Sequence, residues 1–162
     1  MTSEQGSLFP DPPETEIDII PGAITITGSR ELEREVCMPL FETHLTQRTA
    51  KQKTWFIGGA RGLDTWALEW LLNLGEFCWA VVPFTAAEQP RAVRTVLTKA
   101  TKVIELRLPK SKGAYIQRNH YMVDRSSMVI GFWSGKKGGT TATLEYAIKV
   151  GKEIHASPVI MP

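Results

Sequence analysis

The chain has 162 residues, of which 43% are hydrophobic and 22% charged, and this predicts one folded domain with a sizeable apolar core. The formal net charge of +2 excludes the whole-molecule field that draws strongly basic proteins to nucleic acids or membranes. No apolar run approaches the roughly 18 residues that indicate a membrane span. Two cysteines, Cys37 and Cys78, with no signal peptide favour reduced core thiols in a cytoplasmic protein.

The first segment of the chain differs in composition from the rest. Residues 1–16 are rich in proline, acidic residues, serine and glycine and show no helical or strand period. Such a segment cannot bury enough apolar surface to fold, so we predict a flexible N-terminal tail. Residues 17–162 are then expected to form a single domain.

From residue 23 onward, short apolar segments alternate with segments of helical period. The predicted strands are residues 23–28, 54–59, 77–84, 102–106, 127–133 and 153–161. The predicted helices are residues 31–45, 63–74, 89–100, 114–125 and 141–150. Pro39 is expected to kink or end the first helix. Strands joined by helices require crossover connections, so we predict an α/β fold: a three-layer, Rossmann-like, doubly wound, mostly parallel sheet with helices on both faces.

Three of the predicted strands end in glycine, followed by a cation or a hydroxyl and then by a helix. The turns are residues 27–30 (TGSR), 58–64 (GGARGLD) and 133–141 (WSGKKGGTT). Glycine lets the backbone approach a ligand, and the first N–H groups of a helix are unsatisfied and partly positive. Parallel strands end at one edge of the sheet, so the turns predict a single phosphate-binding crevice.

The predicted ligand contacts come from these turns and from the helix before the fifth strand. From the turns they include Gly28, Ser29, Arg30, Gly58, Gly59, Arg61, Ser134, Gly135, Lys136, Lys137, Gly138, Gly139, Thr140 and Thr141. Arg118 is placed to clamp a phosphate with two donors, and the alternative is a surface arginine packed by its aliphatic stem. Helix capping alone is the alternative for the hydroxyl residues.

Other site classes find less support in the sequence. Neither GxGxxG nor GxxxxGK[ST] occurs, which argues against a dinucleotide dehydrogenase and a P-loop nucleotidase. No ligand spacing indicates a metal site. Glu145, one turn into the helix after the third turn, is a candidate to stabilise positive charge as a glycosidic bond breaks, with ordinary helix electrostatics as the alternative. Trp133, Phe84 or Trp55 are candidates to stack on a base, with core packing as the alternative.

The motifs at residues 27–30, 57–67, 118–135 and 136–154 together resemble the SLOG superfamily, which includes YpsA-type proteins, DprA DNA-processing proteins and LOG phosphoribohydrolases. The resemblance spans about residues 23–157. It implies a bacterial or phage protein with a Rossmann-like fold, a nucleotide or ADP-ribose-type ligand, and commonly a homo-oligomer. Carried over by motif, it implies ligand contacts from Gly28, Ser29, Arg30, Gly58, Gly59, Asp64, Arg118, Asn119, Gly138, Gly139 and Thr140.

Three functional hypotheses follow. The first is a nucleotide-binding sensor or module that takes an ADP-ribose or NAD-type ligand or a nucleoside phosphate, with no further cofactor and no membrane partner. The second is a nucleotide N-glycosidase in which Glu145 or Asp64 stabilises the developing cation. The LOG enzymes carry their glutamate three residues after the threonine, where this chain has Thr143. The third is a DprA-like binder of single-stranded DNA.

Overall fold

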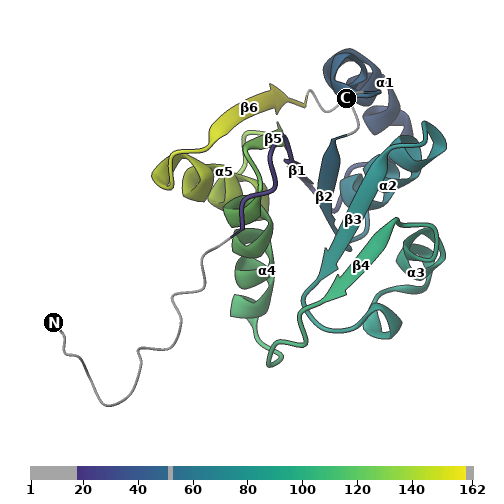
Figure 1. Cartoon of the computed structure of the whole chain (residues 1–162), viewed down its shortest axis with the longest axis vertical. Helices are drawn as coiled ribbons and strands as arrows, with labels where there is room; N and C mark the ends of the chain where they lie inside the picture. The colour runs from purple at the N-terminus through teal and green to yellow at the C-terminus, as the bar shows by residue number, and fades with distance from the viewer. Residues whose placement is uncertain (1–17, 51–52, 160–162) are drawn as a thin grey trace, which may run out of the picture.

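The computed structural model describes residues 18–50 and 53–159 and contains one six-stranded sheet (Figure 1). The strands are β1 Ile24–Gly28, β2 Thr54–Gly58, β3 Phe77–Val82, β4 Lys102–Glu105, β5 Met128–Trp133 and β6 Glu153–Pro158. Their order is β4-β3-β2-β1-β5-β6, and every neighbouring pair is parallel. The predicted α/β fold is confirmed, and the sheet is parallel throughout rather than mostly parallel. The tail predicted at residues 1–16 lies outside the described residues.

Five α-helices cover the two faces of the sheet. They are α1 Arg34–Leu45, α2 Leu63–Asn73, α3 Arg91–Leu97, α4 Lys112–Arg125 and α5 Gly139–Lys149. The first three lie on one face and α4 and α5 on the other (Figure 1). The chain steps outward from β1 to β4, then returns through α4 to β5 on the other side of β1. The strand order therefore reverses between β1 and β5, which is where sheets of this kind bind ligands.

The apolar strands are buried because helices cover both of their faces. Under α1 and α2, the ring of Phe41 lies 5.5 Å from that of Phe132 and 5.8 Å from that of Trp70. Under α4, Phe56, Val81 and Met122 form a second cluster. The sheet is therefore anchored on both sides, and its strand ends are held in a fixed relation to one another.

Helix α1 differs from its prediction. It begins at Arg34, three residues later than expected, and runs to Leu45 with Pro39 inside it, so the expected early end was wrong. Pro39 is exposed, whereas Phe41 and Leu45 beyond it are fully buried. Their burial stabilises the last turns although proline removes one backbone hydrogen bond. Helix α3 is also shorter than expected, covering only Arg91–Leu97.

The two cysteines are both buried and unbonded, as predicted. Burial raises the pKa of each thiol to about 12, so neither is a reactive thiolate at neutral pH. Among the described helices, none combines the length and the hydropathy that crossing a bilayer requires.

One buried polar contact ties the start of β2 to the end of α2. The indole N–H of Trp55 donates to Glu76 at 2.9 Å, and the backbone N–H of Ala50 donates to the other carboxylate oxygen at 2.9 Å. Trp55 is fully buried and Glu76 is 8% exposed, so removing the carboxylate leaves the indole donor without its partner.

We expect Glu76→Ala to lower the free energy of unfolding by about 2 kcal/mol, because a buried donor loses a charged acceptor. Glu76→Gln keeps an acceptor and is expected to lose less than half as much. Urea unfolding measures both, with Glu35→Ala on the exposed side of α1 as a control. Equal midpoints for Glu76→Ala and the wild type would contradict the assigned role of this contact.

Candidate functional site

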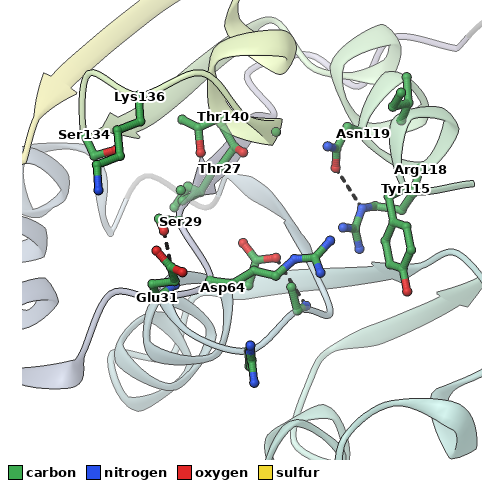
Figure 2. Close-up of a pocket in the computed structure, with 18 of the residues that line it drawn as sticks. Thr27, Ser29, Glu31, Asp64, Tyr115, Arg118, Asn119, Ser134, Lys136 and Thr140 are labelled. Atoms are coloured by element: carbon green, nitrogen blue, oxygen red, sulfur yellow. Dashed lines mark hydrogen bonds between the residues drawn. The ribbon is translucent and has the colours of Figure 1, made fainter. Parts of the chain in front are cut away.

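A cleft of about 480 Å³ lies beyond the carboxyl ends of the strands around β1 (Figure 2). We call it the main cleft. Its walls come from the turn after β1, the turn into α2, one face of α4 and the loop that leads into α5. It is lined by Ile26, Thr27, Gly28, Ser29, Arg30, Glu31, Ala60, Arg61, Asp64, Tyr115, Ile116, Arg118, Asn119, Met122, Ser134, Lys136, Lys137, Gly138, Gly139 and Thr140.

Most of the residues singled out in the sequence line this one cleft. Those that do are Gly28, Ser29, Arg30, Arg61, Asp64, Arg118, Asn119, Ser134, Lys136, Lys137, Gly138, Gly139 and Thr140. Those outside its lining are Gly58, Gly59, Gly135, Thr141 and Glu145. Glu145 is exposed on α5. The geometry therefore gives Glu145 no contact with a ligand held in the main cleft.

The cleft also has apolar lining that the sequence reasoning missed as ligand contacts. Tyr115 is 37% exposed and Ile116 52% exposed. Tyr115 and Met122 lie three residues before and four residues after Arg118, so they share its face of α4. That spacing is the signal that would have found them. The cleft thus pairs an anion-binding side with an apolar side.

The side chains of Asp64 and Arg118 both lie close to Gly58. A Cβ atom at Gly58 would lie 2.8 Å from Asp64 Oδ2 and 2.8 Å from Arg118 Nη1. Asp64 is 8% exposed and Arg118 is 4% exposed, so the interpretation of Arg118 as a surface residue was wrong. Any side chain at position 58 would enter the space between the two charged groups. Glycine is therefore required there by close approach rather than by a turn.

The two charged groups are held by local hydrogen bonds. Asp64 accepts from the backbone N–H of Ala60 at 3.3 Å. The Arg118 Nε–H donates to the side-chain oxygen of Asn119 at 2.8 Å (Figure 2), and its Nη1 donates to the carbonyl of Val81 at 3.2 Å. These bonds fix the direction of the guanidinium while Arg118 still lines the cleft.

Burial changes the titration of both groups. Loss of solvation raises the pKa of Asp64 to about 7, against the opposing effects of the Arg118 charge, the Ala60 N–H and Arg30. Loss of solvation also lowers the pKa of Arg118, which Asp64 partly offsets. The carboxyl group of Asp64 therefore changes protonation state near neutral pH, at the floor of a cleft.

The turn after β1 is tied to the start of α2. The backbone N–H of Leu63 donates to the carbonyl of Ser29 at 3.2 Å. Gly62 has a φ of 78°, and a Cβ there would lie 2.3 Å from the carbonyl oxygen of Arg30. The hydroxyl of Ser29 also accepts from the N–H of Glu31 at 3.1 Å (Figure 2). This is a turn contact and not the helix cap that was the alternative for this hydroxyl, since α1 begins only at Arg34. Two of the predicted glycine turns are thus packed against each other.

The third turn is open. A Cβ at Gly138 or Gly139 would meet no atom within 4 Å, so neither glycine is required by packing. Helix α5 begins at Gly139 without a side-chain cap, and the hydroxyl of Thr141 donates to the carbonyl of Lys136 at 2.8 Å instead of capping it. The first N–H groups of α5 therefore keep their binding capacity for a group in the cleft.

A second cleft of about 380 Å³ adjoins the first, and we call it the side cleft. It is lined by Arg30, Gly59, Ala60, Arg61, Phe84, Glu88, Gln89, Pro90, Lys110, Tyr115 and Arg118. Gly59 is thus on this side, and its carbonyl accepts from the Nε2 of the buried Gln89. Arg30, Arg61 and Arg118 belong to both clefts, so the two hollows share a cationic boundary.

The three aromatic residues proposed to stack on a base differ in burial and in their position relative to the clefts. Trp55 is fully buried, so core packing, the alternative to stacking, is confirmed for this residue. Trp133 is 40% exposed, but it lines neither cleft and donates to Thr141 at 3.0 Å. Phe84 lines the side cleft. Of the three candidates, only Phe84 stands where a ligand base can reach it.

Solved structures share the fold of this chain. DNA processing protein A (DprA) from Streptococcus pneumoniae aligns with a TM-score of 0.72 at 20% identity, over 86% of this chain and 51% of its own. DprA from Helicobacter pylori, described for its single-stranded DNA binding mode, aligns with a TM-score of 0.71 at 20% identity, over 94% and 76%. A structural-genomics target, TM1055, aligns with a TM-score of 0.59 at 16% identity, over 82% and 72%.

These similarities show that the chain has the Rossmann-like fold of the DprA structures, which is the fold that the resemblance to the SLOG superfamily implied. At such identities the likeness is one of fold. The chain spans about half the length of the S. pneumoniae protein. No protein-family model and no curated protein sequence matches the chain.

The site geometry predicts opposite outcomes for two glycine substitutions. Gly58→Ala is expected to destabilise the protein by about 1–3 kcal/mol, because its methyl group must displace the Arg118 guanidinium or the Asp64 carboxylate. Gly139→Ala meets open space and is expected to leave stability unchanged or raise it, since alanine favours a helix. Denaturant unfolding of both variants checks this, and equal effects would contradict the close approach at Gly58.

The raised pKa of Asp64 predicts a specific pH dependence of stability. Between its ordinary value of 3.8 and about 7, Asp64 holds a proton in the native state but not in the unfolded state. Its contribution is therefore fully present below about pH 4 and is lost as pH rises through about 7. The unfolding free energy of the wild type should fall relative to Asp64→Asn across that range and stay level above it. Parallel pH profiles for the two proteins would contradict the raised pKa.

Proposed function

We propose that this protein binds a nucleotide or a nucleotide-derived ligand in the main cleft, with its phosphate on the glycine turns. The observation that carries the proposal is convergence: the turns after β1 and β5 and the start of α2 line one hollow with the buried Arg118. Arg118 offers guanidinium donors, and α5 offers unsatisfied N–H groups, on different sides of the same space. A phosphate is the group whose charge and size match this set of donors.

The remaining lining is suited to the other parts of a nucleotide. Asp64, on the floor of the cleft, accepts hydrogen bonds from sugar hydroxyls when ionised and donates one when protonated. Ile116, Met122 and the ring of Tyr115 form an apolar wall against which a planar base packs. Lys136 and Lys137 are exposed at the mouth and attract the phosphate by charge.

Single-stranded DNA is the second candidate ligand, and a specific observation favours it. The H. pylori DprA that shares this fold has a single-stranded DNA binding mode. The lining of the main cleft contains five cations, Arg30, Arg61, Arg118, Lys136 and Lys137, against two acidic residues, Glu31 and Asp64. A local basic cleft of this kind binds a phosphodiester backbone although the net charge of the chain is only +2.

Fewer residues of the main cleft support cleavage of an N-glycosidic bond than support binding alone. It requires a carboxylate beside the sugar, and the cleft lining contains Asp64 and Glu31 but not Glu145. Asp64 is the group that remains suited to this role, since its pKa of about 7 allows either protonation state at neutral pH. Binding without cleavage does not require a carboxylate beside the sugar, so binding is the main proposal.

Binding is expected to depend on the cleft cations and not on arginine in general. In calorimetric titrations with AMP and with ADP-ribose, Arg30→Ala and Lys137→Ala should each weaken binding about ten-fold, because each removes a charge-assisted contact to phosphate. Arg34→Ala is the control, since Arg34 is equally exposed but lines neither cleft.

The same titrations separate the candidates. An oligodeoxynucleotide that binds where AMP and ADP-ribose do not, with affinity that falls steeply with salt, would replace the nucleotide proposal with DNA binding. Release of adenine from AMP, detected by chromatography, would replace it with cleavage. No binding of any of these ligands would refute the assignment of the cleft.

A further inference from the structure

The side cleft contains an aromatic residue, Phe84, that the main cleft lacks, and it shares Tyr115 with the main cleft. Its aromatic wall consists of Phe84, which follows β3, and Tyr115 on α4, with ring centroids 5.8 Å apart and an interplanar angle of 81°. Phe84 is half-buried and Tyr115 is 37% exposed. Two aromatic rings at right angles form a corner in which a flat group contacts one face and one edge.

The boundary between the clefts is cationic. The guanidinium carbon of Arg30 lies 4.9 Å from the centroid of the Tyr115 ring, and the exposed Arg61 stands on the same boundary. A ligand that passes from the main cleft to the side cleft therefore crosses arginines before it reaches the aromatic corner. Negative charge is favoured at that crossing, and a planar ring is favoured beyond it.

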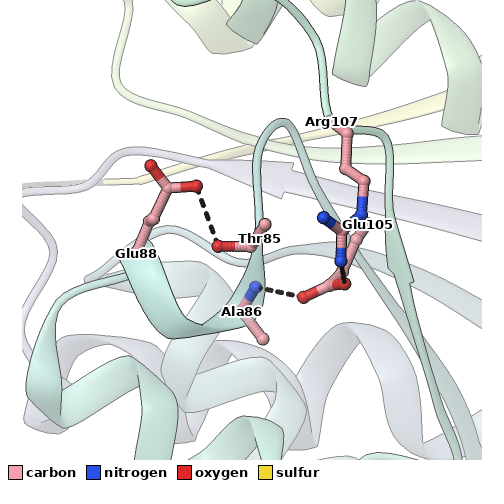
Figure 3. A network of polar contacts seen from close by, with 5 residues as sticks. All are labelled: Thr85, Ala86, Glu88, Glu105 and Arg107. Carbon is pink, nitrogen blue, oxygen red and sulfur yellow. Dashed lines mark hydrogen bonds and ion pairs between the residues drawn. The ribbon is translucent and has the colours of Figure 1, made fainter.

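The wall of the side cleft is held by its own polar network (Figure 3). Glu105 at the end of β4 accepts from the backbone N–H of Ala86 at 2.7 Å and from Arg107 at 2.8 Å. Glu88 accepts from the hydroxyl of Thr85 at 2.8 Å and forms an ion pair with Lys110. These contacts cross-link the segment that follows Phe84. They therefore hold the backbone that positions the Phe84 ring in the side cleft.

We propose that the side cleft is a second subsite, which binds the base of a further nucleoside joined through phosphate to the nucleotide in the main cleft. The inference rests on the proposed function and names the ligand class more closely: a nucleotide with two bases. The second base stacks on Phe84 and Tyr115, and the linking phosphate contacts Arg30 and Arg61. A pyrophosphate-linked dinucleotide and a short single-stranded oligonucleotide share this chemistry.

The test compares one-base and two-base ligands by calorimetry on the full chain. The probes are AMP, NAD⁺ and the 5′-phosphorylated dinucleotide of deoxyadenosine. Wild-type protein is expected to bind at least one two-base probe about ten-fold more tightly than AMP, the gain that stacking of one additional base supplies. The probe that shows the gain identifies the linkage, pyrophosphate or phosphodiester.

Phe84→Leu is the decisive variant, because Phe84 lines the side cleft but not the main cleft. It should abolish the advantage of the two-base probe and leave AMP affinity unchanged, which also shows that the variant is folded. Phe84→Tyr should keep the advantage, and Trp133→Leu, an exposed aromatic outside both clefts, should have no effect.

Failure of this inference is distinct from failure of the proposed function. If AMP binds and neither two-base probe binds more tightly, or if Phe84→Leu keeps the advantage, the second subsite is refuted while nucleotide binding stands. If no probe binds to the wild type, both are refuted.

Discussion

The site depends on the absence of a side chain at Gly58, where β2 ends. Asp64 and Arg118 come from helices on opposite faces of the sheet, and each approaches to within 2.8 Å of where a Cβ would stand. Side chains from the two faces of the sheet therefore come close to the same backbone position, Gly58. Burial of the two side chains raises the free energy of their charged forms, and the opposite charge of each group partly offsets that cost for the other. The free space at Gly58 therefore admits both charged groups, and the hydrogen bonds of Arg118 to Asn119 and Val81 hold its guanidinium at the main cleft.

The reversal of strand order explains why the main cleft exists beside Asp64 and Arg118. The helices after β1 and β5 leave toward opposite faces of the sheet, so the two turns part from each other and leave space between them. The turn after β1 is held by the bond from Leu63 to Ser29, whereas the loop into α5 is open. The cleft thus combines a fixed wall with an accessible helix N-terminus, a combination suited to admitting and then holding an anion.

The candidate site could be predicted in its backbone elements but not in all its side chains. The glycine turns were found because glycine before a helix has a distinctive pattern, and Arg118 was found by its place before β5. Tyr115 and Ile116 were not among the predicted ligand contacts, since an apolar period does not tell a core face from a cleft face. Glu145 was considered as a ligand contact because it lies one turn into the helix after the third turn, yet it faces solvent outside the main cleft.

The amino-acid sequence by itself determined the alternation of strands and helices, the parallel sheet and the edge of the sheet at which the main cleft lies, because these follow from local apolar period and from crossover geometry. The tertiary structure decided which charged groups are buried, that α1 continues through Pro39, and that two clefts share one arginine boundary. Those outcomes depend on contacts between residues far apart in the chain, such as Arg118 with Val81 and Gly58. Their spacing and burial are set only when the two faces of the sheet are covered.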